Sequence, residues 1–141
     1  MSEGPKKAGV LGSPIAHSRS PQLHLAAYRA LGLHDWTYER IECGAAELPV
    51  VVGGFGPEWV GVSVTMPGKF AALRFADERT ARADLVGSAN TLVGRRMAGG
   101  PTTPTSTGWP VSYTHLTLPT ILLVCIFLGS SLLNYPIITL R

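Results

Sequence analysis

The stretch AGVLGSPIAHSRSPQLHLAAYRALG, residues 8–32, sets the pattern that the following sequence repeats. Ala8–Leu11 is a short apolar run before a glycine, which predicts a buried strand. Ser20 and Pro21 predict a helix start, with serine as the N-cap and proline at the first helical position. Apolar residues then recur at helical spacing until Gly32, which predicts the helix end. The stretch therefore indicates a strand, a polar loop and a helix.

The same alternation continues up to residue 93. Valine-rich or alternating segments predict strands at residues 36–41, 59–65 and 88–93, and helical spacing predicts helices at residues 45–52, 70–75 and 77–85. This order indicates an α/β fold, an open, twisted and mostly parallel sheet with helices on both faces. Ligands bind beyond the carboxyl ends of the strands in such sheets, and three polar clusters fall there.

Composition narrows the class of protein. The chain has 141 residues, of which 45% are hydrophobic and 15% charged, values that fit a globular domain rather than a disordered chain. The net charge of +3 is spread along the sequence, which argues against a nucleic-acid partner. Cys43 and Cys125 lie far apart, so neither a disulfide framework nor a metal site is expected. With no apolar core of a signal peptide near the N-terminus, we expect a cytoplasmic location.

The first polar cluster is GSPIAHSRSP, residues 12–21. It places Ser18 and Ser20 between a strand end and a helix start. Two hydroxyls beside free backbone N–H groups can hold a carboxylate. In the alternative interpretation, Ser20 only caps its helix and Ser18 faces solvent.

The other two clusters are SVTMPGK, residues 63–69, and GSANT, residues 87–91. Thr65 lies at a strand end, and Lys69 falls in the first turn of a helix, against the preference of the helix dipole. A lysine partly shielded from water can transfer protons, although a solvated surface lysine is the simpler interpretation. The amide of Asn90 can bond two neighbouring hydroxyls, or it can belong to an ordinary turn.

In this order, the three clusters resemble the substrate-binding domain of shikimate dehydrogenases, and the resemblance runs from Ala8 to Val93. That family carries S-x-S after its first strand, then N-V-T-x-P-x-K, then G-A-x-N-T. Ser63 stands where the family commonly has asparagine, which implies that one hydroxyl contact is lost or bridged by water. Ser88 replaces the usual alanine beside the site.

The resemblance implies a role for each matching residue. The substrate carboxylate would be held by Ser18 and Ser20. Ring hydroxyls would be bound by Thr65 and Asn90, with Ser63 beside them. Lys69 would be the catalytic acid–base group for the hydroxyl that is oxidised.

The implied reaction is the reversible, NADP-dependent reduction of 3-dehydroshikimate to shikimate, in the chorismate route to aromatic amino acids. The family's D-N-T-D motif and a glycine-rich phosphate loop are missing from the sequence. We therefore expect weak shikimate binding and no turnover from this chain. A stand-alone shikimate- or quinate-binding module, and a quinate-preferring or NAD-using relative, remain as alternatives.

The sequence changes character after residue 93, so we interpret residues 1–93 as the substrate-binding domain. Residues 94–110 are of low complexity, and back-translation in a shifted frame from Met97 gives GWRADNTDVDGV, which restores the missing motif. Residues 111–141 begin with VSYTHLTLPT, which resembles a translated sequencing adapter and predicts a non-native read-through. A membrane anchor over residues 116–140 is the alternative, although two prolines and an asparagine interrupt it.

Overall fold

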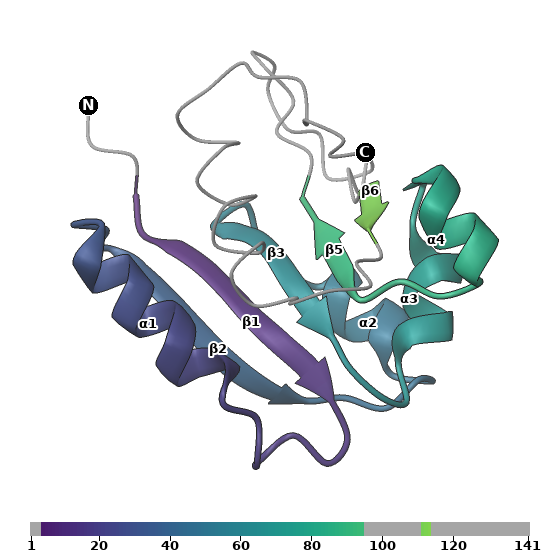
Figure 1. Cartoon of the computed structure of the whole chain (residues 1–141), viewed down its shortest axis with the longest axis horizontal. Coiled ribbons are helices and arrows are strands. Elements are labelled where there is room, and N and C mark those ends of the chain that lie inside the picture. The colour runs from purple at the N-terminus through teal and green to yellow at the C-terminus, as the bar shows by residue number, and fades with distance from the viewer. Residues whose placement is uncertain (1–3, 95–110, 114–141) are drawn as a thin grey trace.

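The computed structural model describes residues 4–94 and 111–113, and within these residues six strands form one sheet (Figure 1). The strand order is β2-β1-β3-β5-β6-β4. The strands are β1 (Lys6–Gly12), β2 (Trp36–Glu42), β3 (Trp59–Val64), β4 (Glu78–Arg79), β5 (Thr91–Val93) and β6 (Val111–Tyr113). The helices are α1 (Ser20–Ala30), α2 (Leu48–Gly53), α3 (Lys69–Phe75) and α4 (Ala81–Val86).

The predicted α/β fold with a mostly parallel sheet is confirmed. Strand β1 pairs in parallel with both β2 and β3, whereas β5 runs antiparallel to β3. Val10 lies in register with Arg40 on one side and with Ser63 on the other. The carboxyl ends of β1 and β3 therefore meet at one rim of the sheet.

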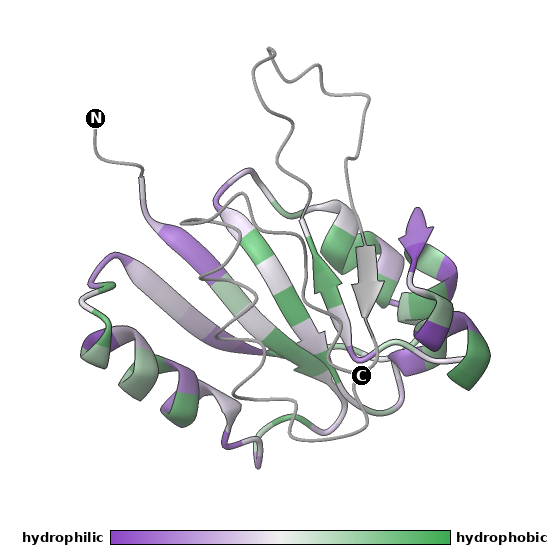
Figure 2. Cartoon of the chain, turned by 45° about the horizontal axis from the view of Figure 1, so that its top comes forward, coloured by the Kyte–Doolittle hydropathy of each residue, from purple (hydrophilic) through white to green (hydrophobic). Residues whose placement is uncertain are grey.

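Helices cover both faces of the sheet. Helix α1 packs along β1 and β2, and the helices α2, α3 and α4 lie on the opposite face (Figures 1 and 2). The core on the α1 face consists of Ala8, Val10, Ile15, Tyr28 and Tyr38. The larger core on the other face is built mainly from Leu11, Leu48, Val62, Val64, Ala72 and Leu92.

A register shift in β3 decides which way its side chains point. Lys7 pairs with Trp59 but Ala8 pairs with Gly61, so Val60 is an extra residue on β3. Val60 packs with the α1 core, whereas Val62 packs with the opposite core. Such a shift exchanges the faces of the residues that follow it, because side chains alternate along a strand. It places Ser63 on the same face as α1.

The starts of α1 and α4 differ from the sequence predictions. Ser20 is the first residue of α1 rather than its N-cap, which is Arg19. The Oγ of Ser18 instead accepts a hydrogen bond from the N–H of Ser20 at 3.3 Å. The predicted helix over residues 77–85 is wrong in its first part, because residues 78–79 form β4. Helix α4 begins after Thr80, whose side chain accepts from a helical N–H and so fixes the boundary.

Smaller differences concern two other elements. The helix predicted over residues 45–52 begins only at Leu48, and the strand predicted over residues 88–93 begins at Thr91. Within residues 4–94 and 111–113, no helix has the length and apolar character needed to cross a membrane. The segment 116–140, to which the membrane alternative refers, lies outside the described residues.

Candidate functional site

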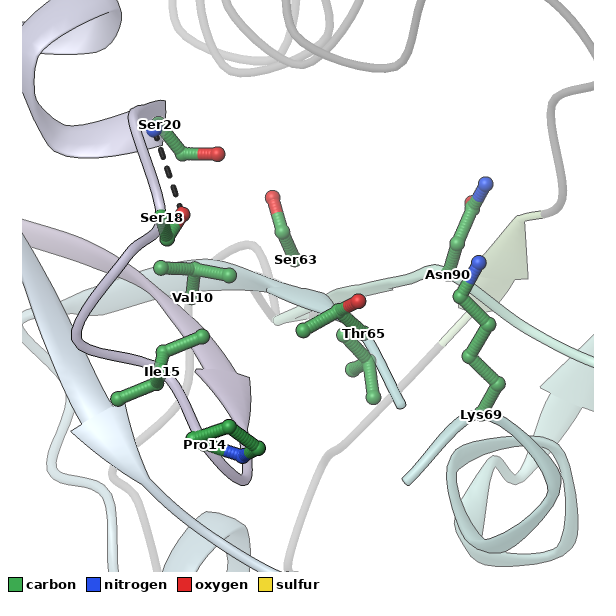
Figure 3. Close-up of a pocket in the computed structure, with 10 residues that line it drawn as sticks. Val10, Pro14, Ile15, Ser18, Ser20, Ser63, Thr65, Lys69 and Asn90 are labelled. Carbon is green, nitrogen blue, oxygen red and sulfur yellow. Dashed lines mark hydrogen bonds between the residues drawn. The ribbon is translucent and has the colours of Figure 1, made fainter. Parts of the chain in front are cut away.

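A pocket of about 340 Å³ opens at the rim where β1 and β3 end, a volume suited to a small molecule (Figure 3). Polar groups and apolar side chains share its lining. The lining residues are Val10, Pro14, Ile15, Ser18, Ser20, Ser63, Val64, Thr65, Lys69 and Asn90. All six residues that the sequence singled out for the site therefore line this one pocket.

The polar groups occupy two ends of the pocket. In Figure 3, Ser18 and Ser20 lie at one end, which we call the serine end, and Lys69 and Asn90 lie at the other, the lysine end. Ser63 lies between the two ends. Each end is supplied by a segment that follows or precedes a strand, so the sheet itself sets their separation.

The serine end presents a hydroxyl donor. The N–H of Ser20 donates to the Oγ of Ser18 at 3.3 Å, which occupies an acceptor site of that oxygen and leaves its proton available. The carbonyl of Ser18 is already occupied, because it accepts two hydrogen bonds from the Arg40 guanidinium, at 2.9 Å from Nε and 2.7 Å from Nη2. Such an arrangement suits an anionic oxygen placed beside both serines.

The lysine end is held by its backbone. Lys69 is the first residue of α3, as predicted, and its carbonyl accepts a hydrogen bond from Ala89 at 3.0 Å. The carbonyl of Asn90 accepts from the N–H of Val64 at 2.8 Å. The hydroxyl of Thr91 donates to the amide oxygen of Asn90 at 3.3 Å and so orients that amide. The ammonium of Lys69 and an oriented amide therefore line the same end of the pocket.

The middle of the pocket contains a contact that sequence reasoning missed. The hydroxyls of Tyr38 and Ser63 are hydrogen bonded at 2.9 Å, with Tyr38 on β2 and buried. Burial raises the pKa of Tyr38 well above its ordinary value, and hydrogen bonds with Ser63 and Ser20 act in the opposite direction. Tyr38 is therefore a neutral phenol at physiological pH. The alternation of Tyr38, Arg40 and Glu42 along β2 was the only signal in the sequence.

The chemistry of the site follows from these groups. Hydroxyls at one end, an ammonium and an amide at the other, and apolar side chains in the lining fit a small hydroxylated ring that carries an anionic group. Among the residues that the structure describes, no cluster of histidine, cysteine and carboxylate side chains could hold a metal ion. In the same residues, no G-x-G-x-x-G turn joins a strand to a helix.

Known proteins share this sequence pattern and this fold. The family model described as "Shikimate dehydrogenase substrate binding domain" matches residues 10–92. A shikimate dehydrogenase (NADP(+)) of Roseobacter denitrificans is 45% identical over 86 residues, which cover 60% of this chain and 31% of that protein.

Solved structures agree with the sequence matches. The shikimate dehydrogenase of Mycobacterium tuberculosis superposes with a TM-score of 0.66 and 85% identity, over 77% of this chain and 37% of that one. A shikimate 5-dehydrogenase of Listeria monocytogenes, solved with shikimate and NAD, superposes with a TM-score of 0.61 and 38% identity, over 64% of this chain and 32% of that one. This chain thus spans about a third of the length of these enzymes.

Proposed function

The chain belongs to the family of shikimate dehydrogenase substrate-binding domains, and on this premise we propose that its pocket binds shikimate and 3-dehydroshikimate. The observation that carries the proposal is the convergence of three sequence clusters on one cavity. Hydroxyl groups gather at one end of it and an ammonium at the other, which suits a ring with a carboxylate at one side and hydroxyls at the other.

We assign a role to each polar residue of the pocket. Ser18 and Ser20 hold the carboxylate, because their hydroxyls and the adjoining helix start form the serine end. Thr65 and Asn90 bind the ring hydroxyls. Lys69 exchanges the proton of the hydroxyl that is oxidised, since it is the ammonium that lines the lysine end.

Ser63 has a smaller share in binding. Its side chain is shorter than the asparagine that the family commonly has at this position, and its hydroxyl is bonded to Tyr38. We propose that Ser63 reaches the ligand by a single hydrogen bond or through a water molecule.

The reaction that we propose for the whole enzyme is the NADP-dependent interconversion of shikimate and 3-dehydroshikimate. NADP supplies the hydride chemistry. The curated relatives are named as NADP(+) enzymes, whereas no G-x-G-x-x-G turn joins a strand to a helix in the described residues. We propose that the described residues carry the substrate half of the site. A cytoplasmic location belongs to the proposal, because Cys43 is a free and buried thiol.

The limits of the domain are part of the proposal. We assign residues 1–93 to the substrate-binding domain, residues 94–110 to a shifted reading frame and residues 111–141 to read-through. The family model ends at residue 92, in keeping with this boundary, while β6 adds residues 111–113 to the sheet. The nucleotide sequence of codons 90–125 tests the assignment: native flanking DNA without adapter-like codons would contradict it.

Titration calorimetry of the purified chain with shikimate tests the proposed function. Binding is expected, and Ser18→Ala should weaken it by about tenfold, because a hydrogen bond to a charged group is lost. Ser88→Ala is the matched control, since Ser88 lies beside the site without lining the pocket. Undetectable binding, or equal losses in both variants, would contradict the proposal. NADP-dependent shikimate oxidation by this chain alone is expected to be undetectable.

A further inference from the structure

We propose that strand β2, which supplies no residue to the pocket lining, positions the serine end through its side chains Tyr38, Arg40 and Glu42. The inference rests on the proposed function, because it concerns how the carboxylate of the ligand is held. The three residues are spaced two apart along the strand and therefore share one face of it, the face on which α1 packs. Arg40 and Glu42 bond to the loop between β1 and α1, whereas Tyr38 bonds to Ser63 on β3 and stacks on His24 of α1.

Tyr38 connects the two walls of the pocket. Its hydroxyl lies 2.9 Å from the Oγ of Ser63 on β3, and the side chain of Ser20 on α1 is near enough to lower the pKa of the phenol. Both serines line the pocket, so the buried phenol holds the hydroxyl of Ser63 and lies near that of Ser20. The Ser63 hydroxyl is only partly buried, and without this partner it would bond elsewhere.

Helix α1 locks the position of Tyr38. The His24 ring is fully buried and stacks on Tyr38, with ring centroids 3.9 Å apart and planes 10° apart. The Nδ1–H of His24 donates to the carbonyl of Ser20 at 2.8 Å, and burial lowers the pKa of the ring, which favours its neutral form. His24 therefore links the Tyr38 ring, on which it stacks, to the backbone of Ser20.

Arg40 holds the backbone of the same loop. Its two bonds to the carbonyl of Ser18 form a fork that a lysine could not reproduce. Because the side chain of Arg40 is exposed and lies outside the pocket lining, its contribution to binding is the orientation of Ser18. The guanidinium also places a positive charge near the end where we expect a carboxylate.

Glu42 holds the start of the loop. Its carboxylate accepts from the hydroxyl of Ser13 at 2.5 Å and from the N–H of Ile15 at 3.1 Å. Ile15 lines the pocket, so this bond sets the apolar side of the serine end. Strand β2 thus holds the loop near its start through Glu42 and near its end through Arg40.

The test compares two buried tyrosines. Tyr38→Phe removes a hydroxyl that bonds to Ser63, whereas Tyr28→Phe removes a buried hydroxyl without a hydrogen-bond partner among the described residues. Titration calorimetry with shikimate should show affinity lowered about fivefold by Tyr38→Phe, the value of one neutral hydrogen bond, and changed less than about twofold by Tyr28→Phe. Thermal denaturation of both variants records any loss of stability.

A second ligand separates positioning from general destabilisation. Methyl shikimate, the neutral ester, lacks the charge that the serine end is built to hold. If β2 positions the carboxylate site, Tyr38→Phe and Arg40→Gln should weaken the binding of shikimate more than the binding of the ester. A merely structural role would weaken both ligands equally.

The outcomes are distinct. A wild-type chain that binds no shikimate would overturn the proposed function and this inference together. Wild-type binding with unchanged affinity in Tyr38→Phe and Arg40→Gln would overturn the inference alone. If Tyr38→Phe and Arg40→Gln lost equal affinity for shikimate and for its ester, the inference alone would again be overturned.

Discussion

The backbone N–H of Ala89 donates a hydrogen bond to the carbonyl of Lys69 at 3.0 Å. This bond joins the start of α3 to the segment that carries Asn90 into the pocket. The two residues of the lysine end are thus held by one backbone contact, although 21 positions separate them in the sequence. The shape of residues 87–90 therefore decides how the ammonium and the amide face the ligand.

Gly87 tests this relationship. Its φ of +74° is a left-handed conformation that strains any residue with a Cβ, although no atom lies within 4 Å of the position a Cβ would take. Gly87→Ala should destabilise the fold by about 1 kcal/mol and weaken shikimate binding, because the strain falls on the segment that carries Asn90. Urea denaturation and calorimetric titration measure the two effects.

Gly32 provides the matched control. It has a φ of +72°, also with open space around it, but it follows α1 far from the pocket lining. Gly32→Ala should reduce stability by a similar amount and leave the affinity for shikimate unchanged. Equal losses of affinity in both variants would show that Gly87 acts through stability alone.

Gly12 limits the space behind Thr65. A Cβ at this position would collide with the side chain of Thr65 and would lie 3.1 Å from Ile15, and both of these residues line the pocket. Gly12→Ala should therefore weaken shikimate binding by about tenfold, beyond its effect on stability. Gly9→Ala on the same strand would meet the carbonyl of Glu39 instead, so it should destabilise the fold without changing the affinity.

The stability of the fold should fall in mild acid because of His24. Burial lowers the pKa of His24 below its ordinary value of 6.5, while the backbone hydrogen bond to Ser20 acts in the opposite direction. As the pH falls below about 6.5, the unfolded chain takes up a proton that the folded chain resists. The contribution of neutral His24 to the free energy of unfolding is therefore present above that pH and is lost as the pH falls below it.

Urea denaturation at about pH 7.5 and about pH 5.5 measures this loss. His24→Leu removes the titrating ring, so its free energy of unfolding should fall less between the two pH values than that of the wild type. Carboxylates titrate alike in both proteins and cancel in the comparison. An equal fall in both proteins would assign the acid sensitivity to other groups.

Thr80 should stabilise α4 without contributing to binding. Its side chain accepts a hydrogen bond from the N–H of Ala83 at 3.2 Å, which satisfies one free donor at the helix start. Thr80→Ala should cost about 1 kcal/mol of unfolding free energy, and Thr80→Ser should restore most of it. The affinity for shikimate should be the same in all three proteins, as measured by calorimetry.

The order of the strands and helices was predictable because local signals agreed with the fold. The apolar run before Gly12, the S-x-S-P loop and the valine-rich segment over residues 59–65 each have one stable interpretation in an α/β domain. The gathering of Ser18, Lys69 and Asn90 was also predictable, because segments at the carboxyl ends of strands meet at one rim.

Other features depend on contacts that spacing does not reveal. The helix predicted over residues 77–85 failed in its first turn because the bond between Thr80 and Ala83 fixes a later start. Tyr38 reaches Ser63 only because the register shift at Val60 turns Ser63 toward α1. A one-residue irregularity of this kind leaves no periodic trace in the sequence.

Backbone hydrogen bonds fasten the pocket loops to one another: Ser13 to Met66, Thr65 to Leu11, Val64 to Asn90 and Ala89 to Lys69. The conformational entropy of these loops is therefore lost when the chain folds, before a ligand binds. A ligand meets a preorganised receptor whose main chain has little left to rearrange. Association should resemble the docking of two rigid bodies, so its heat-capacity change should reflect only the surface that the ligand covers.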